Sequence, residues 1–185
     1  MIPRIVGFSG STRRPSRTRT LIETVGTEIS ARRPVSLEIY DLVDAGPGIG
    51  TASREALPRA AHAIISAIEE ADALIVGSPV YKGSYAGLFK HLIDFVDPTA
   101  LAGTPVLLTA TGGGHRHALV VEHQLRPLFG FFSALTLPTA IYAGDQDFRE
   151  GVVADHALSA RIAQAAAELD RALAAPARHA IPHVA

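Results

Sequence analysis

The sequence contains no cysteine, and this absence removes several kinds of chemistry. Disulfide bonds, thiolate nucleophiles and cysteine-ligated metal sites are all excluded. The chain also lacks any uninterrupted apolar run of about 18 residues, so we expect no membrane-spanning segment. Its first residues, MIPRIVGFSG, lack the apolar stretch of a signal peptide, and we therefore expect a cytoplasmic protein.

The chain has almost no excess of charge of either sign. Its 17 basic and 18 acidic side chains leave a formal net charge of −1, which favours neither nucleic acid nor an anionic membrane as a partner. Four arginines nevertheless gather between Arg13 and Arg19, which indicates a small anionic ligand. No acidic or thiolate ligand accompanies the histidines at 115, 117 and 123, so we expect no metal site.

Short apolar runs alternate along the chain with longer segments of helical periodicity. Runs rich in β-branched residues predict strands at 4–9, 35–42, 73–78, 105–111 and 135–143. This alternation predicts an α/β fold, with a parallel sheet covered by helices on both faces. A chain of 185 residues suits one domain, which we expect to span 1–175, followed by a tail at 176–185.

Each of the five predicted helices carries one apolar stripe with a spacing of three or four residues. A stripe of this kind faces the sheet, so we expect its members to be buried. The stripes contain Leu21, Ile22, Val25 and Ile29; Ala60, Ile64, Ala67 and Ile68; Tyr85, Leu88, Phe89, Leu92, Ile93 and Val96; Leu119, Leu125, Phe129 and Phe132; and Leu158, Ile162, Ala165 and Leu169.

Three polar loops, at 9–18, 78–84 and 111–117, follow strands at the sheet edge where such folds bind ligands. The first loop opens a helix, whose unpaired N–H groups and dipole attract an anion. Its hydroxyl groups and Arg17 suit a terminal phosphate. The G-x-G-x-x-G of dinucleotide sites and the Gly-Lys-Ser/Thr of Walker loops are both missing. The alternative is a solvated basic loop in which Ser16 only caps the helix.

The other two loops have features of a site for a flat ring. In GSPVYKGSYAG (77–87), Pro79 fixes the backbone, Tyr81 offers an aromatic wall, and two glycines allow close approach. In TATGGGHRH (109–117), three glycines expose backbone N–H groups. A phosphate at 11–18 and an isoalloxazine between 79–82 and 111–115 together match FMN. Each loop could instead be an ordinary strand-to-helix turn, with Ser84 as the cap after the second.

These motifs, in this order, resemble the NAD(P)H-dependent FMN reductases of two-component sulfonate monooxygenases, and the methanesulfonate type most closely. The resemblance covers residues 4–145 and rests on SGSTRRPSRTRTL, GSPVYKGSYAGLFKHLIDFV and TATGGGHRHALVVEHQLRPLFGFFSAL. It implies a flavodoxin-like three-layer sandwich with a five-stranded sheet in the order 2-1-3-4-5. The flavin contacts carried over by motif are Ser11, Ser16, Arg17 and Thr18 for the phosphate, and Pro79, Val80, Tyr81, Lys82, Thr111, Gly112, Gly113, Gly114 and His115 for the ring.

The implied activity is hydride transfer from NADH or NADPH to FMN, with NADH favoured, and delivery of FMNH2 to a partner monooxygenase. The cofactors carry this chemistry, so the protein needs only to hold the two rings together, and we assign no catalytic residue. An FMN-bound quinone or azo reductase is one alternative. A flavodoxin-like electron carrier is another, although such carriers are usually strongly acidic.

Pro127 lies inside the predicted helix HALVVEHQLRPLFGFF (117–132). Because proline has no N–H, the carbonyl of His123 loses its helical partner, and a π-type turn is expected there. The resemblance implies the same turn, at a subunit interface near the flavin. Apolar residues on two faces of this helix also favour burial against another subunit, in a homodimer or homotetramer. The alternative is a simple proline kink with His123 exposed.

Overall fold

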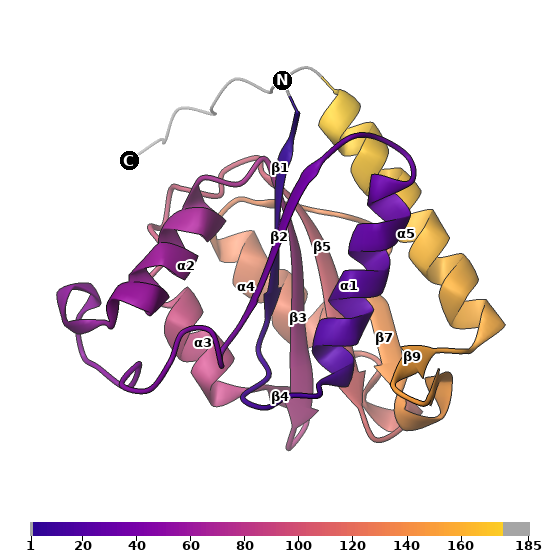
Figure 1. Ribbon diagram of the computed structural model, residues 1–185, viewed down its shortest axis with the longest axis horizontal. Helices are drawn as coiled ribbons and strands as arrows, with labels where there is room; N and C mark the ends of the chain where they lie inside the picture. Colours follow the sequence, from indigo (N-terminus) through magenta and orange to yellow (C-terminus); the bar gives the residue numbers. More distant parts are fainter. Residues whose placement is uncertain (1, 176–185) are drawn as a thin grey trace.

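The computed structural model describes residues 2–175, and its centre is a twisted, mainly parallel sheet (Figure 1). The sheet order is β2-β1-β3-β5, and β6 and β7 both pair with β5 on its far side. The parallel strands are β1 (Arg4–Ser9), β2 (Ser36–Asp41), β3 (Ala73–Tyr81), β5 (Pro105–Gly112), β6 (Leu135–Thr136) and β7 (Ile141–Gly144). If β6 and β7 are counted as one fifth strand, the order is the 2-1-3-4-5 that the sequence predicted.

The predicted strand at 135–143 is in fact broken into β6 and β7, and this corrects the expectation of five strands. Pro138 stands at the break and has no N–H to donate to the ladder. The N–H of Thr139 instead donates to a carboxylate oxygen of Glu168 at 2.9 Å. A short antiparallel strand, β4 (Ser84–Tyr85), also joins the sheet beside β3, so the sheet has seven strands.

Helices cover both faces of the sheet (Figure 1). On one face α1 (Arg17–Ser30) and α5 (His156–Ala174) pack together, and their buried side chains join Ile5 and Ile75 in one core cluster. On the other face α2 (Arg59–Glu69), α3 (Gly87–Ile93) and α4 (Arg126–Phe131) pack around a second cluster that includes Val6 and Val76. Neighbouring strand residues thus point to opposite cores, as the pleat requires.

The predicted apolar stripes are largely buried, with three clear exceptions. Ala60 is exposed and its neighbour Ala61 is buried instead, while the other predicted members of the α2 stripe are buried. Leu88 on α3 and Leu119, just before the π-helix, are also exposed. Exposed apolar side chains such as Leu88 and Leu119 are candidates for contact with a partner subunit.

The helix that contains Pro127 is not regular. A π-helix, η3 (Val121–Leu125), holds His123, and α4 then begins at Arg126 with Pro127 in its first turn. The N–H of Arg126 donates to the carbonyl of Val121, five residues earlier, and Pro127 follows with no N–H to donate. The π-type turn expected from the sequence is therefore present, and the side chain of His123 is exposed.

Three short 3-10 helices and a small hairpin complete the described chain. They are η1 (Arg54–Ala56), η2 (His115–His117), η4 (Asp145–Asp147) and the antiparallel pair β8 (Phe148–Arg149) and β9 (Val152–Val153). No helix among residues 2–175 has both the length and the apolar character needed to cross a bilayer. The tail predicted at 176–185 lies outside the described residues.

Candidate functional site

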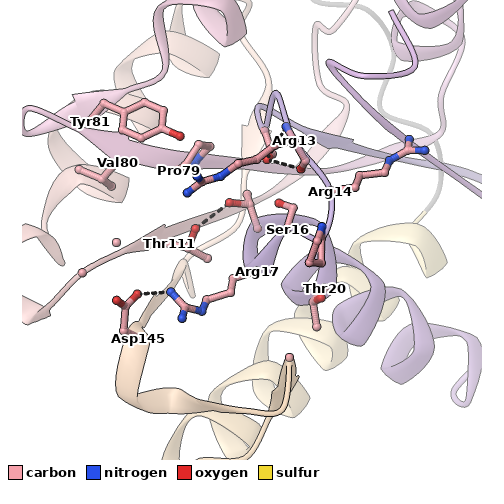
Figure 2. Close-up of a pocket in the computed structure, with 16 residues that line it drawn as sticks. Arg13, Arg14, Ser16, Arg17, Thr20, Pro79, Val80, Tyr81, Thr111 and Asp145 are labelled. Carbon is pink, nitrogen blue, oxygen red and sulfur yellow. Dashed lines mark hydrogen bonds and ion pairs between the residues drawn. The ribbon is translucent and has the colours of Figure 1, made fainter.

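A cavity of about 650 Å³ opens at the carboxyl ends of β1, β3 and β5 (Figure 2). This volume is within the range of small-molecule and cofactor sites. The three loops singled out in the sequence all contribute to it, together with the segment that follows β7. The lining residues are Ser11, Arg13, Arg14, Pro15, Ser16, Arg17, Thr18, Thr20, Pro79, Val80, Tyr81, Thr111, Gly112, Gly113, Asp145 and Gly151.

The first wall is the turn from β1 into α1. The N–H of Gly10 donates to the carbonyl of Gly77 at 2.7 Å, and a Cβ at Gly10 would come within 2.7 Å of Phe89. The backbone at Gly10 therefore lies close against β3 and α3 as the chain leaves the sheet. Ser16 caps α1 by accepting the N–H of Arg19 at 3.3 Å, which leaves the N–H groups of Arg17 and Thr18 for a ligand.

Two arginines of the cluster, Arg14 and Arg19, hold this loop in place through Asp41, although Arg14 also lines the cavity. The carboxylate of Asp41, fully buried at the end of β2, accepts hydrogen bonds from Arg14 at 2.7 Å and from Arg19 at 2.9 Å. Asp44 adds an ion pair with Arg14 at 2.6 Å. Burial alone would raise the pKa of Asp41, but the hydrogen bonds from both arginines hold this pKa below its ordinary value.

The other two arginines face the cavity. Arg17 pairs with Asp145 at 2.6 Å, and its guanidinium carbon lies 6.0 Å from the centre of the Phe148 ring. In the described chain, no acidic side chain pairs with Arg13. Figure 2 shows the Arg13 side chain extending across the cavity toward Pro79. Of the three arginines that line the cavity, Arg14 and Arg17 are paired with carboxylates, and Arg13 has no such partner in the described chain.

The second wall is the end of β3. Pro79, Val80 and Tyr81 line the cavity, and Tyr81 is 50% exposed at its mouth. Lys82 and Gly83 form the two-residue turn to β4, with φ angles of 53° and 83°, as a type I′ turn requires. Lys82 is thus at the tip of a hairpin and outside the lining, and its contact with a ring stays a prediction.

Ser84 does not cap the helix that follows this turn. Its hydroxyl donates to Gln124 at 3.1 Å, while the residue that precedes α3 is Ala86. The N–H of Ala86 donates to the Ser78 hydroxyl at 2.9 Å. The loop is therefore an ordered hairpin rather than the simple capped turn that the sequence left open.

The third wall is the end of β5. Thr111 and Thr18 share a hydrogen bond of 2.6 Å between their hydroxyls, which joins this wall to the first (Figure 2). A Cβ at Gly112 would lie 2.5 Å from the Tyr142 hydroxyl, so only glycine fits there. Tyr142 also donates to the carbonyl of Gly114 at 2.6 Å and thereby holds the glycine loop.

Several predicted residues lie outside the lining. Gly114 and His115 follow Gly113 away from the cavity, and His115 Nε2 contacts the amide nitrogen of Gln146 at 2.6 Å. His123 instead borders a separate hollow of about 170 Å³ with His117, Arg116 and Gly83. Pro127 lines neither cavity.

The lining also contains residues that were not among the individually named flavin contacts. Arg13, Arg14 and Pro15 lie inside the segment 11–18 that was predicted to hold the phosphate, and Thr20 lies in the helix that follows it. Asp145 and Gly151 come from a segment that no motif identified, more than 120 residues from the first loop. Only the fold brings that segment to the cavity.

Comparison with known proteins places the chain in a family. Residues 3–149 match the family model described as NADPH-dependent FMN reductase. An NADH-dependent FMN reductase, SfnF, of Pseudomonas fluorescens is 50% identical over 164 residues, which is 88% of each chain. An FMN reductase (NADPH) of Pseudomonas aeruginosa is 48% identical over the same length and share of each chain.

Solved structures agree with this placement. An oxidoreductase from Corynebacterium diphtheriae is 34% identical and superposes with a TM-score of 0.81, over 94% of this chain and 97% of that one. A flavodoxin from the domain Archaea, at 11% identity and TM-score 0.63 over 91% and 98% of the two chains, confirms that the fold is flavodoxin-like. The chain belongs to the NADPH-dependent FMN reductase family, and it is an oxidoreductase that uses NADH or NADPH to reduce FMN.

Proposed function

We propose that FMN occupies the 650 Å³ cavity with its phosphate against the turn into α1 and its ring between the ends of β3 and β5. The observation that carries this proposal is the hydroxyl-lined turn at the N-terminus of α1, where N–H groups and arginines converge. Ser11, Ser16 and Thr18 all line the cavity there. Bound FMN supplies the ring that accepts a hydride, and the chain supplies the position of that ring.

The charges of the first wall define which arginines would hold the phosphate. Arg14 and Arg19 are bound to the buried Asp41, so their guanidinium groups are already neutralised. Arg17 and Arg13 face the cavity, and we infer that both approach the phosphate. Arg13 is thereby added to the contacts that the resemblance implied, since it is the cavity arginine without an acidic partner in the described chain.

The mouth of the cavity suits a second ring stacked on the first. Tyr81 is half exposed there, and Gly113 leaves the opposite side without a side chain. Hydride transfer needs close contact between the nicotinamide and the flavin, which an open face permits. NADH is our proposed donor, because the SfnF relative of 50% identity is named as NADH-dependent.

We infer that the reduced flavin passes to a separate flavin-dependent monooxygenase, and that both proteins act in the cytoplasm. The resemblance to reductases of sulfonate monooxygenases supports this partner.

A homodimer or homotetramer is also proposed, because Leu119 and Phe131 near η3 are 63% and 69% exposed. Exposed apolar surface of this kind is typical of sites where another protein binds.

Oxidation of NADH and NADPH, each measured with FMN, FAD and riboflavin, tests the proposed site. FMN should be strongly preferred to riboflavin, because riboflavin lacks the phosphate. Arg17→Ala and Arg13→Ala should each weaken FMN binding by about 1–2 kcal/mol and leave riboflavin binding unchanged. Arg32→Ala is the matched control, since Arg32 lies just after the end of α1, pairs with Glu28 of that helix and does not line the cavity. Equal rates with FMN and riboflavin would contradict the phosphate site.

A further inference from the structure

Asp145 places a carboxylate inside a cavity whose other charged side chains are basic. It belongs to η4, directly after β7, and lines the cavity opposite the turn into α1. Its oxygen accepts a hydrogen bond from Arg17 at 2.6 Å (Figure 2). An acidic group at a phosphate site works against binding, because it repels the dianion and neutralises the arginine that would attract it.

The ion pair of Arg17 differs in kind from the pairs of its neighbours. Asp41, the partner of Arg14 and Arg19, is fully buried, and both arginines together compensate its charge. The side chains of Arg17 and Asp145 are 52% and 56% exposed. Exposed pairs of this kind are weak, so a ligand can replace one partner at little cost.

The segment after β7 holds Asp145 within reach of the Arg17 guanidinium. The N–H of Gly144 donates to Asp147 at 2.7 Å, which fixes the turn that carries Asp145. Phe148, three residues beyond Asp145, lies beside the Arg17 guanidinium at 6.0 Å. Arg17 therefore contacts one short segment through both a charge and an aromatic ring.

We infer that Asp145 competes with the FMN phosphate for Arg17 and thereby sets how fast flavin leaves the site. This inference rests on the proposed position of FMN. When the phosphate binds, Arg17 turns from Asp145 to the phosphate, and when the flavin departs the ion pair forms again. A carboxylate in this place keeps FMN an exchangeable substrate, which suits an enzyme that must hand its product to another protein.

Asp145→Asn tests this role, because it removes the charge and keeps the size of the side chain. Quenching of flavin fluorescence gives the dissociation constant, and stopped-flow displacement gives the rate of release. The variant should bind FMN about three- to tenfold more tightly, mainly through slower release, and should bind riboflavin as the unaltered protein does. Asp94→Asn is the matched control, because Asp94 is similarly exposed, pairs with Lys90 and lies outside the cavity.

A second variant shows whether the effect passes through Arg17. In an Arg17→Ala background, Asp145→Asn should change FMN affinity much less than it does alone. An equal gain in both backgrounds, or unchanged or weaker FMN binding in the single variant, would overturn the inference. These outcomes are distinct from failure of the proposed site, which would appear as equal affinity of the unaltered protein for FMN and riboflavin.

Discussion

At the scale of single residues, the decisive group is a carboxylate that does not touch the ligand site. Asp41 is completely buried at the end of β2 and accepts hydrogen bonds from Arg14, Arg19 and the N–H of Val43. A buried charge is tolerated only when it is paired in this way. The same contacts fix the loop that precedes α1 and engage the guanidinium groups of Arg14 and Arg19.

Asp41→Asn should therefore destabilise the protein more than most single substitutions. Arg14 and Arg19 would lose the buried carboxylate that they share and keep only their partly exposed partners Asp44 and Glu23, and we expect the free energy of unfolding to fall by about 2–4 kcal/mol. Urea unfolding followed by circular dichroism measures this change. Asp94→Asn removes an exposed carboxylate and should cost under about 1 kcal/mol. If the free energy of unfolding fell by the same amount in both variants, burial of the Asp41 carboxylate would not increase its contribution to stability.

The same carboxylate should make the stability of the protein sensitive to acid. Its pKa is lower in the folded protein than the value of about 3.9 expected in the unfolded chain. The ionised form therefore stabilises the fold above about pH 4, and this contribution is lost as the pH falls through the lower, folded pKa. The free energy of unfolding should be measured at pH 7 and at pH 3 for both proteins. It should fall less between these pH values in Asp41→Asn than in the unaltered protein, and an equal fall in both would contradict this.

At the scale of elements, periodicity was informative wherever one face of an element is buried. The stripe of α1 and the continuous apolar run of β3 are examples, because their side chains fill the two cores. Periodicity did not show the split between β6 and β7. Pro138 marks the break in the sequence, but the contact that completes it, in which Glu168 of α5 accepts the N–H of Thr139, comes from the fold. The hairpin of β8 and β9 has two-residue strands, which are too short to show a pattern.

Tyr142 offers a test at this scale, because it connects β7 to the glycine loop after β5. Tyr142→Phe removes the hydrogen bond to Gly114 and should cost about 0.5–1.5 kcal/mol of stability. The amides of 113–117 should exchange faster with deuterium, while those of β5 stay protected. FMN and riboflavin binding should weaken equally, since this loop would contact the ring rather than the phosphate. If FMN binding weakened and riboflavin binding did not, Tyr142 would act on the phosphate site rather than on the ring.

At the scale of the whole molecule, the order of the strands explains where the site lies. The chain leaves β1 for β2 on one side and then returns to β3 on the other, so the loops after β1 and β3 diverge. Ligands of parallel α/β sheets bind in the crevice at such a reversal. The position of the site was therefore predictable from the alternation of strands and helices, and the three polar loops marked it. The involvement of Asp145 was not, because its loop carries no motif.

The exposed apolar side chains of the molecule predict self-association. Light scattering during size-exclusion chromatography should give a mass that is a multiple of 19.5 kDa. Phe131→Glu should shift the protein toward the single chain, because it puts a charge at the most exposed phenylalanine near η3. Val152→Glu changes a side chain that is 59% exposed on β9, and it should leave the mass unchanged. A single-chain mass for the unaltered protein would contradict the proposed oligomer.

The most direct test is a crystal structure of the protein grown with saturating FMN. The phosphate should lie at the turn into α1, within hydrogen-bond distance of Arg17 and the Thr18 hydroxyl, with the ring between Tyr81 and Gly113. A ring bound at another place, or a phosphate directed away from this turn, would contradict the account.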